Sequence, residues 1–251
     1  MTATEEMTSE KKSPDKGKPS GPLGFVREVV ELVVMVLVLL IAIRWAIAEA
    51  RYIPSSSMEP TLQIEDRLLV EKISGHLHRP YQRGEILVFY PPPSQTGGKD
   101  LSNDPLSILG RLTGLPFLPS ETAYIKRIIG LPGDVIRIQK GVGVFVNGQL
   151  LTEDGYAPDA PNYDLKVLGD IGVDPFGGGT RPYGNPQDAN KEIKVPAGHL
   201  FMMGDNRNNS QDSHAWGFLD QNRVIGRAWL LFWRQLQIPP SLSKQIIERV
   251  E

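Results

Sequence analysis

The feature that most constrains this chain is an uncharged apolar run near its N-terminus. Residues 32–43 (LVVMVLVLLIAI) form 12 uncharged positions, and the wider segment 29–48 is interrupted only by Glu31 and Arg44. A helix of about 20 residues spans roughly 30 Å, the thickness of a bilayer core. Both charges lie near the ends, where long side chains reach the headgroups. A cleaved signal peptide, a core helix and an interfacial helix are the alternatives, but the run has no polar stripe. We therefore expect one transmembrane helix within residues 25–50.

The flanks of this run predict its orientation. Residues 1–24 are polar and cannot bury a core, so we expect a disordered tail on the cytoplasmic side. Basic residues cluster before the helix: Lys11, Lys12, Lys16, Lys18 and Arg27. The positive-inside rule places the residues after about 50 on the far side, in a periplasmic, extracytoplasmic or lumenal compartment. The chain is predicted to be a single-pass membrane protein with the lipid bilayer as a partner.

Composition excludes several classes of function. The chain has no cysteine, which excludes thiol catalysis, disulfides and cysteine-based zinc sites. Its four histidines form no His-Glu-x-x-His pattern, so we expect neither a metal site nor a cofactor. A formal net charge of -2 does not favour nucleic-acid binding, and no nucleic-acid partner is expected.

The remaining chain reads as short strands separated by turns. Asn147-Gly148 fits a type I′ hairpin turn, and Leu131–Asp134 (LPGD) fits a type II turn. We expect a mostly β domain over residues 51–240, built of antiparallel sheets in a barrel-like arrangement, followed by a tail at 241–251. The Pro- and Gly-rich stretches 91–121 and 156–190 are predicted surface insertions. Strands are expected at 67–72, 85–90, 124–129, 135–139, 144–146, 149–151, 193–195, 199–203 and 227–233.

The first segment that carries chemistry is Ile53–Leu62 (IPSSSMEPTL), just after the expected membrane helix. Composition alone favours a Pro/Ser-rich linker. A serine held between prolines near the membrane is, however, well placed to attack a membrane-tethered substrate. Such a serine is inert without a base.

The second segment is Tyr124–Asp134 (YIKRIIGLPGD). Alternation places Lys126 with Tyr124 and Ile128, and Arg127 on the opposite face. Taken alone, this segment favours two exposed strand cations, because lysines are rarely buried. The functional interpretation is that apolar neighbours desolvate Lys126, which lowers its pKa and lets the neutral amine accept a proton from a serine.

The third segment is Gly204–Gly217 (GDNRNNSQDSHAWG), which is dense in hydrogen-bonding side chains. Such clusters are usually polar loops. A supporting network of Asp205, Arg207, Asp212 and Ser213 is the functional alternative. The proximity of His214 to Asp212 raises a further possibility, a triad of Ser57, His214 and an aspartate.

Together and in this order, the three segments resemble the sequence boxes of type I signal peptidases (leader peptidases, peptidase family S26). The matching residues are Pro54–Thr61 for the first box, Tyr124–Asp134 for the second and Gly204–Ser213 for the third. The third box is most similar to the cyanobacterial and thylakoid branch. The resemblance implies a membrane-bound serine endopeptidase that removes signal peptides from exported preproteins after a small residue, in an Ala-x-Ala pattern.

The resemblance also implies residue roles. Ser57 corresponds to the nucleophile and Lys126 to the general base of a Ser-Lys dyad. Ser55 corresponds to the serine that joins the Ser57 backbone N–H in the oxyanion hole. Ser210 corresponds to the residue that orients the lysine, and Asp212 and Arg207 to its support. His214 stands where many bacterial members have arginine, and the family makes a triad unfavourable. Walls for shallow substrate pockets are expected from residues of the matched boxes: Ile53, Pro54, Met58, Leu62, Tyr124 and Ile125.

Two other classes compete with the peptidase. One is a non-catalytic, membrane-anchored binding protein on a decayed protease domain, which the intact boxes disfavour. The other is a relative of the Ser-Lys self-cleaving repressors, which the membrane run and the lack of a helical DNA-binding segment disfavour.

Overall fold

The structure is a computed structural model that describes residues 22–96, 100–115, 117–165 and 192–232. Its chain divides into two compact units, residues 1–40 and 41–251. Helix α1 (Pro22–Ala46) contains the apolar run, and its segment Gly24–Ala46 is, among the described residues, the one helix long and apolar enough to cross a membrane. The predicted apolar helix is thus present. Residues 22–24 of the tail expected at 1–24 belong to α1, whereas residues 1–21 and the tail expected at 241–251 lie outside the described residues.

The helix ends four residues before the predicted boundary at residue 50. Residues Ala48–Tyr52 instead form strand β1, which pairs antiparallel with β2 (Arg67–Glu71). The cause is Glu49, whose carboxylate is buried and accepts contacts from Arg44, Arg51 and Lys72. Burial opposes the charged form of Glu49, but the three cations outweigh it and lower its pKa. Only the strand brings Lys72, which is distant in sequence, to this carboxylate.

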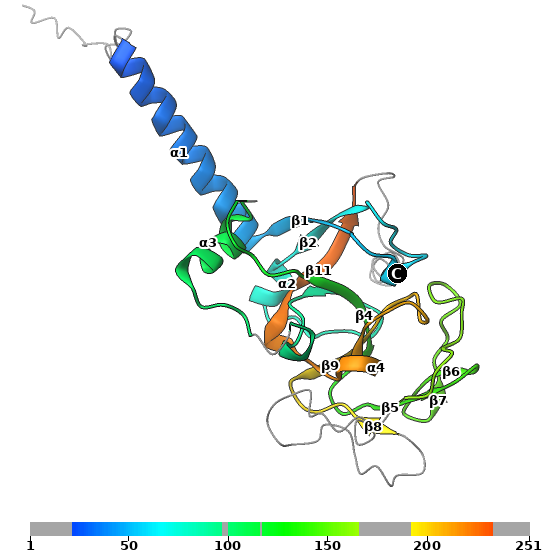
Figure 1. The fold of residues 1–251 in the computed structure, drawn as a ribbon. Helices are drawn as coiled ribbons and strands as arrows, with labels where there is room; N and C mark the ends of the chain where they lie inside the picture. Colours follow the sequence, from blue (N-terminus) through cyan, green and yellow to red (C-terminus); the bar gives the residue numbers. More distant parts are fainter. Residues whose placement is uncertain (1–21, 97–99, 116, 166–191, 233–251) are drawn as a thin grey trace, which may run out of the picture. The chain divides into compact units, whose positions relative to one another are not determined.

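The domain after α1 consists of two antiparallel sheets (Figure 1). The larger has the order β1-β2-β11-β3-β4-β9-β10, and its further strands are β3 (Ile86–Phe89), β4 (Tyr124–Gly130), β9 (His199–Met203), β10 (Leu219–Asp220) and β11 (Val224–Leu231). The smaller has the order β7-β6-β5-β8, formed by β5 (Val135–Gln139), β6 (Gly143–Val146), β7 (Gln149–Leu150) and β8 (Ile193–Lys194). The expected mostly β, antiparallel fold is confirmed.

Both predicted turns have the backbone that their sequences require. Asn147 and Gly148 have φ of 52° and 79° between β6 and β7, as a type I′ turn demands. Gly133 has φ of 93°, and the Asp134 N–H donates to the Leu131 carbonyl at 3.0 Å, as in a type II turn.

Three apolar clusters fill the domain, and β4 runs between them. Ile125 belongs to a cluster with Met58 and Leu62, Ile128 to one with Leu87 and Trp216, and Ile129 to one between the two sheets. Consequently, residues on both faces of β4 are buried. The remaining short elements are η1 (Ser56–Met58), α2 (Ile73–His76), η2 (Pro93–Gln95), α4 (Ser213–Trp216) and η4 (Gln221–Arg223).

The insertion at 91–121 contains a helix that the sequence interpretation did not anticipate, α3 (Pro105–Thr113). The sequence around this helix contains the usual signals of helix ends. Asp104 caps the N-terminus by accepting hydrogen bonds from two backbone N–H groups, Pro105 occupies the first turn, and Gly114 closes the helix with φ of 65°. The second insertion is described only as far as residue 165.

Candidate functional site

The centre of the site is a hydrogen bond between Ser57 and Lys126, the two residues that the sequence boxes predict to be catalytic. Ser57 lies in η1, just after β1, and Lys126 lies in β4 opposite Leu87 of β3. The Lys126 Nζ donates to Ser57 Oγ at 2.6 Å. Both residues are buried: Lys126 is 4% exposed and Ser57 is 8% exposed. The prediction of exposed strand cations, which Tyr124–Asp134 taken alone favours, is therefore wrong. Apolar clusters on both faces of β4 are the reason.

The environment of Lys126 favours the neutral amine. Burial lowers its pKa from 10.5 to about 8, although the charges of Asp212 and Asp205 act in the opposite direction. No hydrogen bond or ion pair joins the amine to a carboxylate in the described part of the chain. An amine with a pKa near 8 that touches a hydroxyl oxygen can remove the hydroxyl proton at mildly alkaline pH.

Arg127, the next residue, is buried with a complete set of partners. Its guanidinium makes two parallel hydrogen bonds to Asp205, of 2.7 and 2.6 Å, and donates to the Gly84 carbonyl at 2.8 Å. The ring of Tyr156 lies 4.0 Å from the guanidinium carbon. Arg127 thus fixes β4 to the loop that follows β9, and its charge is neutralised in place.

The turn that carries Ser57 is held by the third sequence box. The Asn206 N–H donates to the Ser57 carbonyl at 3.1 Å, and the Asn206 side chain donates to the Ser56 carbonyl at 3.2 Å. Asn209 donates to Ser56 Oγ at 2.9 Å. Sequence reasoning did not single out these two asparagines. Their position among many polar residues is a signal of a network, but it does not identify partners 150 residues away.

Gly204 marks the closest approach between these two segments. A Cβ at this position would lie 2.4 Å from the Ser57 carbonyl oxygen and 2.3 Å from Ser210 Oγ. Gly204 N–H donates to Asp212 at 2.9 Å, so the same residue connects the turn that carries Ser57 to the buried carboxylate. The absence of a side chain here is a steric requirement of the site.

The other predicted polar residues surround this core. Ser55 Oγ lies 3.4 Å from Ser57 Oγ. Ser210 Oγ is buried, makes no well-formed hydrogen bond with the described residues, and lies close enough to Asp212 to lower the pKa of that carboxyl. Arg207 is buried and donates to the Gly204 carbonyl at 3.0 Å and to Glu153 at 2.6 Å. Ser55 thus lies directly beside Ser57, whereas Asp212 and Arg207 reach the site through their contacts with Gly204.

Asp212 and His214 form a pair apart from Ser57. Burial opposes the charge of Asp212, yet hydrogen bonds from His214 and the Gly204 N–H keep its pKa below the ordinary value. His214 Nδ1 lies 2.6 Å from Asp212, and its ring stacks on Tyr163 at 4.2 Å. No hydrogen bond links His214 to Ser57 among the described residues. This geometry does not support a triad, because the Ser57 hydroxyl contacts Lys126.

The predicted pocket residues divide into two groups. Ile53, Pro54, Tyr124 and Ile125 line a cavity of about 310 Å³ between β1 and β4. Met58 and Leu62 are fully buried in the apolar cluster beneath it, together with Ile53 and Ile125. They support the floor of the cavity rather than line it. Among residues 22–96, 100–115, 117–165 and 192–232 there is no group of three or more side chains that could hold a metal ion.

A buried serine hydroxyl that contacts an amine of lowered pKa is an arrangement in which a serine can act as a nucleophile. Comparison with known proteins identifies the family. The sequence model described as "Signal peptidase, peptidase S26" matches residues 26–233. The chain belongs to this family, a family of serine peptidases that remove signal peptides from preproteins.

Its relatives are consistent with this assignment. Probable signal peptidase I-1 of Synechocystis is 39% identical over 221 residues, which is 86% of this chain and 89% of the relative. Probable signal peptidase I-2 of the same organism is 41% identical, over 87% of this chain and 78% of the relative. Thylakoidal processing peptidase 1 of Arabidopsis thaliana is 29% identical, over 80% of this chain and 45% of the relative. The relatives and the apolar helix indicate membrane association.

Proposed function

We propose that this chain cleaves preproteins after a small residue, at an Ala-x-Ala type site, through a dyad of Ser57 and Lys126. The observation that carries the proposal is the 2.6 Å contact between Lys126 Nζ and Ser57 Oγ, made by an amine whose pKa burial lowers to about 8. The contact supplies the geometry for proton transfer, and the lowered pKa supplies a neutral acceptor.

The mechanism follows from the pair. The Lys126 amine takes the Ser57 proton while Oγ attacks the carbonyl carbon of the small residue. The tetrahedral intermediate collapses, the carbon–nitrogen bond breaks, and the lysine ammonium gives its proton to the leaving amine. Water then attacks the acyl-enzyme. Lys126 takes a proton from that water and returns one to Ser57 Oγ, which restores the enzyme.

Ser55 and the Ser57 backbone N–H are proposed to stabilise the oxyanion. The Ser55 hydroxyl lies beside Ser57 Oγ and is free to turn toward a carbonyl oxygen as charge develops. Ser210, Asp212 and Arg207 are proposed positioning residues that act through Gly204 and the lysine.

The substrate is proposed to bind as an extended strand along the cavity between β1 and β4. Ile53, Pro54, Tyr124 and Ile125 line it with apolar surface, and Pro54 precedes Ser57 by three residues in the chain. An extended chain gains affinity from backbone hydrogen bonds, and shallow apolar pockets restrict the side chains next to the scissile bond. Such pockets accept alanine and exclude bulky residues sterically.

Orientation in the membrane is part of the same proposal. The basic residues that precede α1 favour an N-terminus in the cytoplasm. The catalytic domain then faces the periplasm or a thylakoid lumen, where a translocated preprotein still tethered by its signal peptide reaches Ser57.

The test is cleavage of a preprotein with an Ala-x-Ala site by the detergent-solubilised full chain. Ser57→Ala and Lys126→Met are each expected to lower kcat/KM by on the order of 10⁴-fold, the loss typical of a removed nucleophile or base. Lys140→Met is the matched control, because Lys140 is exposed in the smaller sheet's turn, and it should retain full activity.

The result that would overturn the dyad is activity retained by Lys126→Met. A wild-type chain that binds the preprotein without turnover would instead favour a non-catalytic binding protein. A substrate series with alanine, valine and phenylalanine before the scissile bond tests the small-residue preference, which predicts falling kcat/KM in that order.

A further inference from the structure

Helix α3 has an inverted distribution of apolar and polar surface. A surface helix ordinarily buries its apolar stripe and exposes its polar face. Here the buried positions are Ser107 and Gly110, whereas Leu106, Ile108 and Leu109 are 55%, 47% and 43% exposed. Ile108 borders a cavity of about 1010 Å³ that Trp45 and Tyr81 also line, whereas Leu106 and Leu109 do not line this cavity. The exposed side of the helix is therefore apolar and its buried side is made of small residues.

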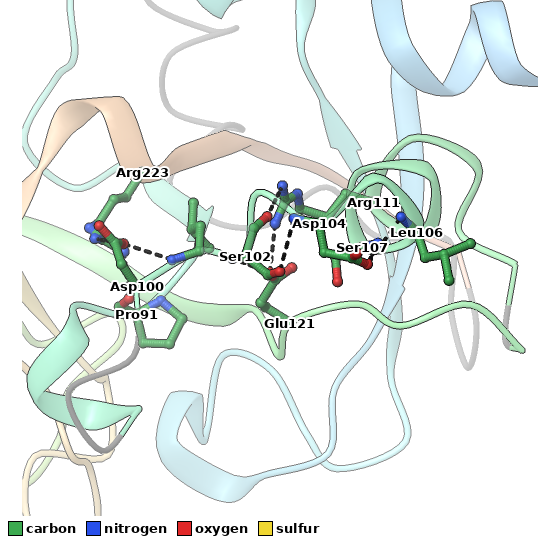
Figure 2. A network of polar contacts seen from close by, with 10 residues as sticks. Pro91, Asp100, Ser102, Asp104, Leu106, Ser107, Arg111, Glu121 and Arg223 are labelled. Carbon is green, nitrogen blue, oxygen red and sulfur yellow. Dashed lines mark hydrogen bonds and ion pairs between the residues drawn. The ribbon is translucent and has the colours of Figure 1, made fainter.

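Polar contacts fix this orientation (Figure 2). Asp104 accepts hydrogen bonds from the N–H groups of Leu106 and Ser107, at 3.1 and 3.2 Å. Arg111 turns inward, donating to Glu121 at 2.6 Å and to the Ser102 carbonyl at 2.7 Å. Rotating the helix to bury its leucines would break the Arg111 contacts, including the ion pair between Arg111 and Glu121.

Close packing adds a steric reason. A Cβ at Gly110 would lie 2.0 Å from the Pro119 carbonyl oxygen, so the helix sits directly on backbone at this position. No larger residue fits there, and the small residues of the inner face are what allow the approach. The outward apolar face is thus a built feature of the segment.

The apolar surface continues beyond the helix. Leu115 is 37% exposed and Phe117 is 77% exposed, in the loop that follows Gly114. Exposed apolar side chains that occur singly need no explanation, but a contiguous group usually marks an interaction site. Leu106, Ile108, Leu109, Leu115 and Phe117 are all exposed within the single segment 106–117, and they are here called the α3 face.

The last turn of α1 contacts this segment. The Arg44 guanidinium packs on Gly114, where a Cβ would lie 2.2 Å from its central carbon. Trp45 follows Arg44 and is 59% exposed. Arg and Trp at the end of an apolar helix are typical of the boundary between acyl chains and headgroups. The Arg44 contact therefore lies at Gly114, one residue before Leu115 of the α3 face.

We propose that the α3 face lies in the interfacial layer of the membrane that holds α1, with its leucines, isoleucine and phenylalanine among the acyl chains. If α1 is the membrane anchor, its end at Arg44 and Trp45 favours lipid over a protein partner, because Arg44 contacts Gly114 beside the α3 face. Arg111 turns inward, and none of the five residues of the α3 face is charged, so we expect its binding to be apolar rather than electrostatic. This second attachment holds the domain at the bilayer surface.

The test uses single cysteines, since the chain has none of its own. Leu109→Cys and Phe117→Cys are labelled with an environment-sensitive fluorophore, and the full chain is reconstituted into phosphatidylcholine vesicles. We expect blue-shifted emission, quenching by nitroxide-labelled lipids, and loss of quenching by aqueous iodide at both positions. High salt should not reverse these signals, because apolar insertion is insensitive to screening.

The control is Leu150→Cys in β7, an apolar residue of similar exposure at 52% on the smaller sheet. Its label should be quenched by iodide and not by nitroxide lipids. Labels at 109 and 117 that behave like the label at 150 would overturn the proposal. Labels protected from both quenchers would overturn it too, because the α3 face would then be covered by protein.

Discussion

Lys126 and Arg127 are adjacent on β4, both almost fully buried, and have opposite electrostatic environments. Arg127 has a carboxylate, Asp205, in bidentate contact. Lys126 has only the Ser57 hydroxyl, and feels Asp205 and Asp212 as charges without touching either. The two cations differ because the loop after β9 delivers its carboxylate to one face of the strand.

The difference teaches what decides the role of a buried cation. A contacting carboxylate compensates the lost hydration and keeps the cation charged, which makes it structural. Without that contact, burial disfavours the charge and lowers the pKa, which makes the amine available as a base. Position in the sequence and degree of burial are nearly the same for both residues, so the difference lies in the carboxylate contact and in the side chain itself, since an amine can lose its proton on burial whereas a guanidinium does not.

Replacing Lys126 by arginine tests the comparison most directly. Guanidinium stays protonated at any pH that proteins tolerate, so Lys126→Arg keeps the charge and removes the base. We expect kcat/KM to fall by on the order of 10⁴-fold on a preprotein substrate, with no recovery at alkaline pH. The reciprocal change, Arg127→Lys, should leave a measurable rate. Substantial activity in Lys126→Arg would show that the lysine is not the base.

Removing the carboxylate contact of Arg127 should cost stability. Asp205→Asn leaves a buried guanidinium without its charge partner, and such losses are about 3–5 kcal/mol. Urea unfolding of the purified chain measures the change, with the exposed Asp154→Asn as control. A loss no larger than that of the control would mean that the Gly84 carbonyl and Tyr156 suffice to hold Arg127.

Methionine substitutions at the two positions should have opposite signs. Below pH 8 Lys126 is charged in both states, and its pKa shift from 10.5 to about 8 corresponds to a cost of about 3 kcal/mol in the folded state. Lys126→Met should therefore raise the free energy of unfolding at pH 7. Arg127→Met should lower it, because Asp205 would then be buried without a positive partner.

The pH dependence provides the check on this pair. Between pH 8 and 10.5 the unfolded chain binds more protons at Lys126 than the folded chain, so wild-type stability rises with pH in that window. The advantage of Lys126→Met should shrink there. An advantage that is constant from pH 7 to 10 would contradict the lowered pKa.

The smallest effect is expected from Asp212→Asn. The Asp212 charge raises the pKa of Lys126, so its removal lowers that pKa further. The activity of the wild type should rise with pH through about 8, and this limb should move to lower pH by a fraction of a pH unit in the variant. A pH–rate profile on a model peptide measures it. Movement toward higher pH would mean that the substitution acts through the position of Gly204.

Much of the fold and the centre of the site were predictable from the sequence. Apolar runs, Asn147-Gly148 and Leu131–Asp134 predicted the strands and turns because period and turn chemistry are local properties. The Ser57–Lys126 pair was predicted by the resemblance of the sequence boxes rather than by physics, since Tyr124–Asp134 taken alone favoured exposed cations.

The misses have a shared cause in contacts between distant segments. β1 was included in the membrane helix because nothing in residues 48–52 announces that Lys72 will meet Glu49. Asn206 and Asn209 were not singled out because their partner, Ser56, lies far along the chain. α3 is different, because its capping residues Asp104 and Gly114 are local signals of a helix. Its exposed apolar residues, however, contradict the usual rule that a surface helix buries its apolar side.

Gly204 restricts how this family member can diversify. Its α-carbon lies between the Ser57 carbonyl and Ser210 with no room for a methyl group. In a saturation library selected for secretion, we expect every amino acid other than glycine to be lost at position 204. The exposed position 208 should accept many amino acids. A directed-evolution campaign toward new cleavage specificity should therefore leave this glycine untouched and vary the rim of the cavity instead.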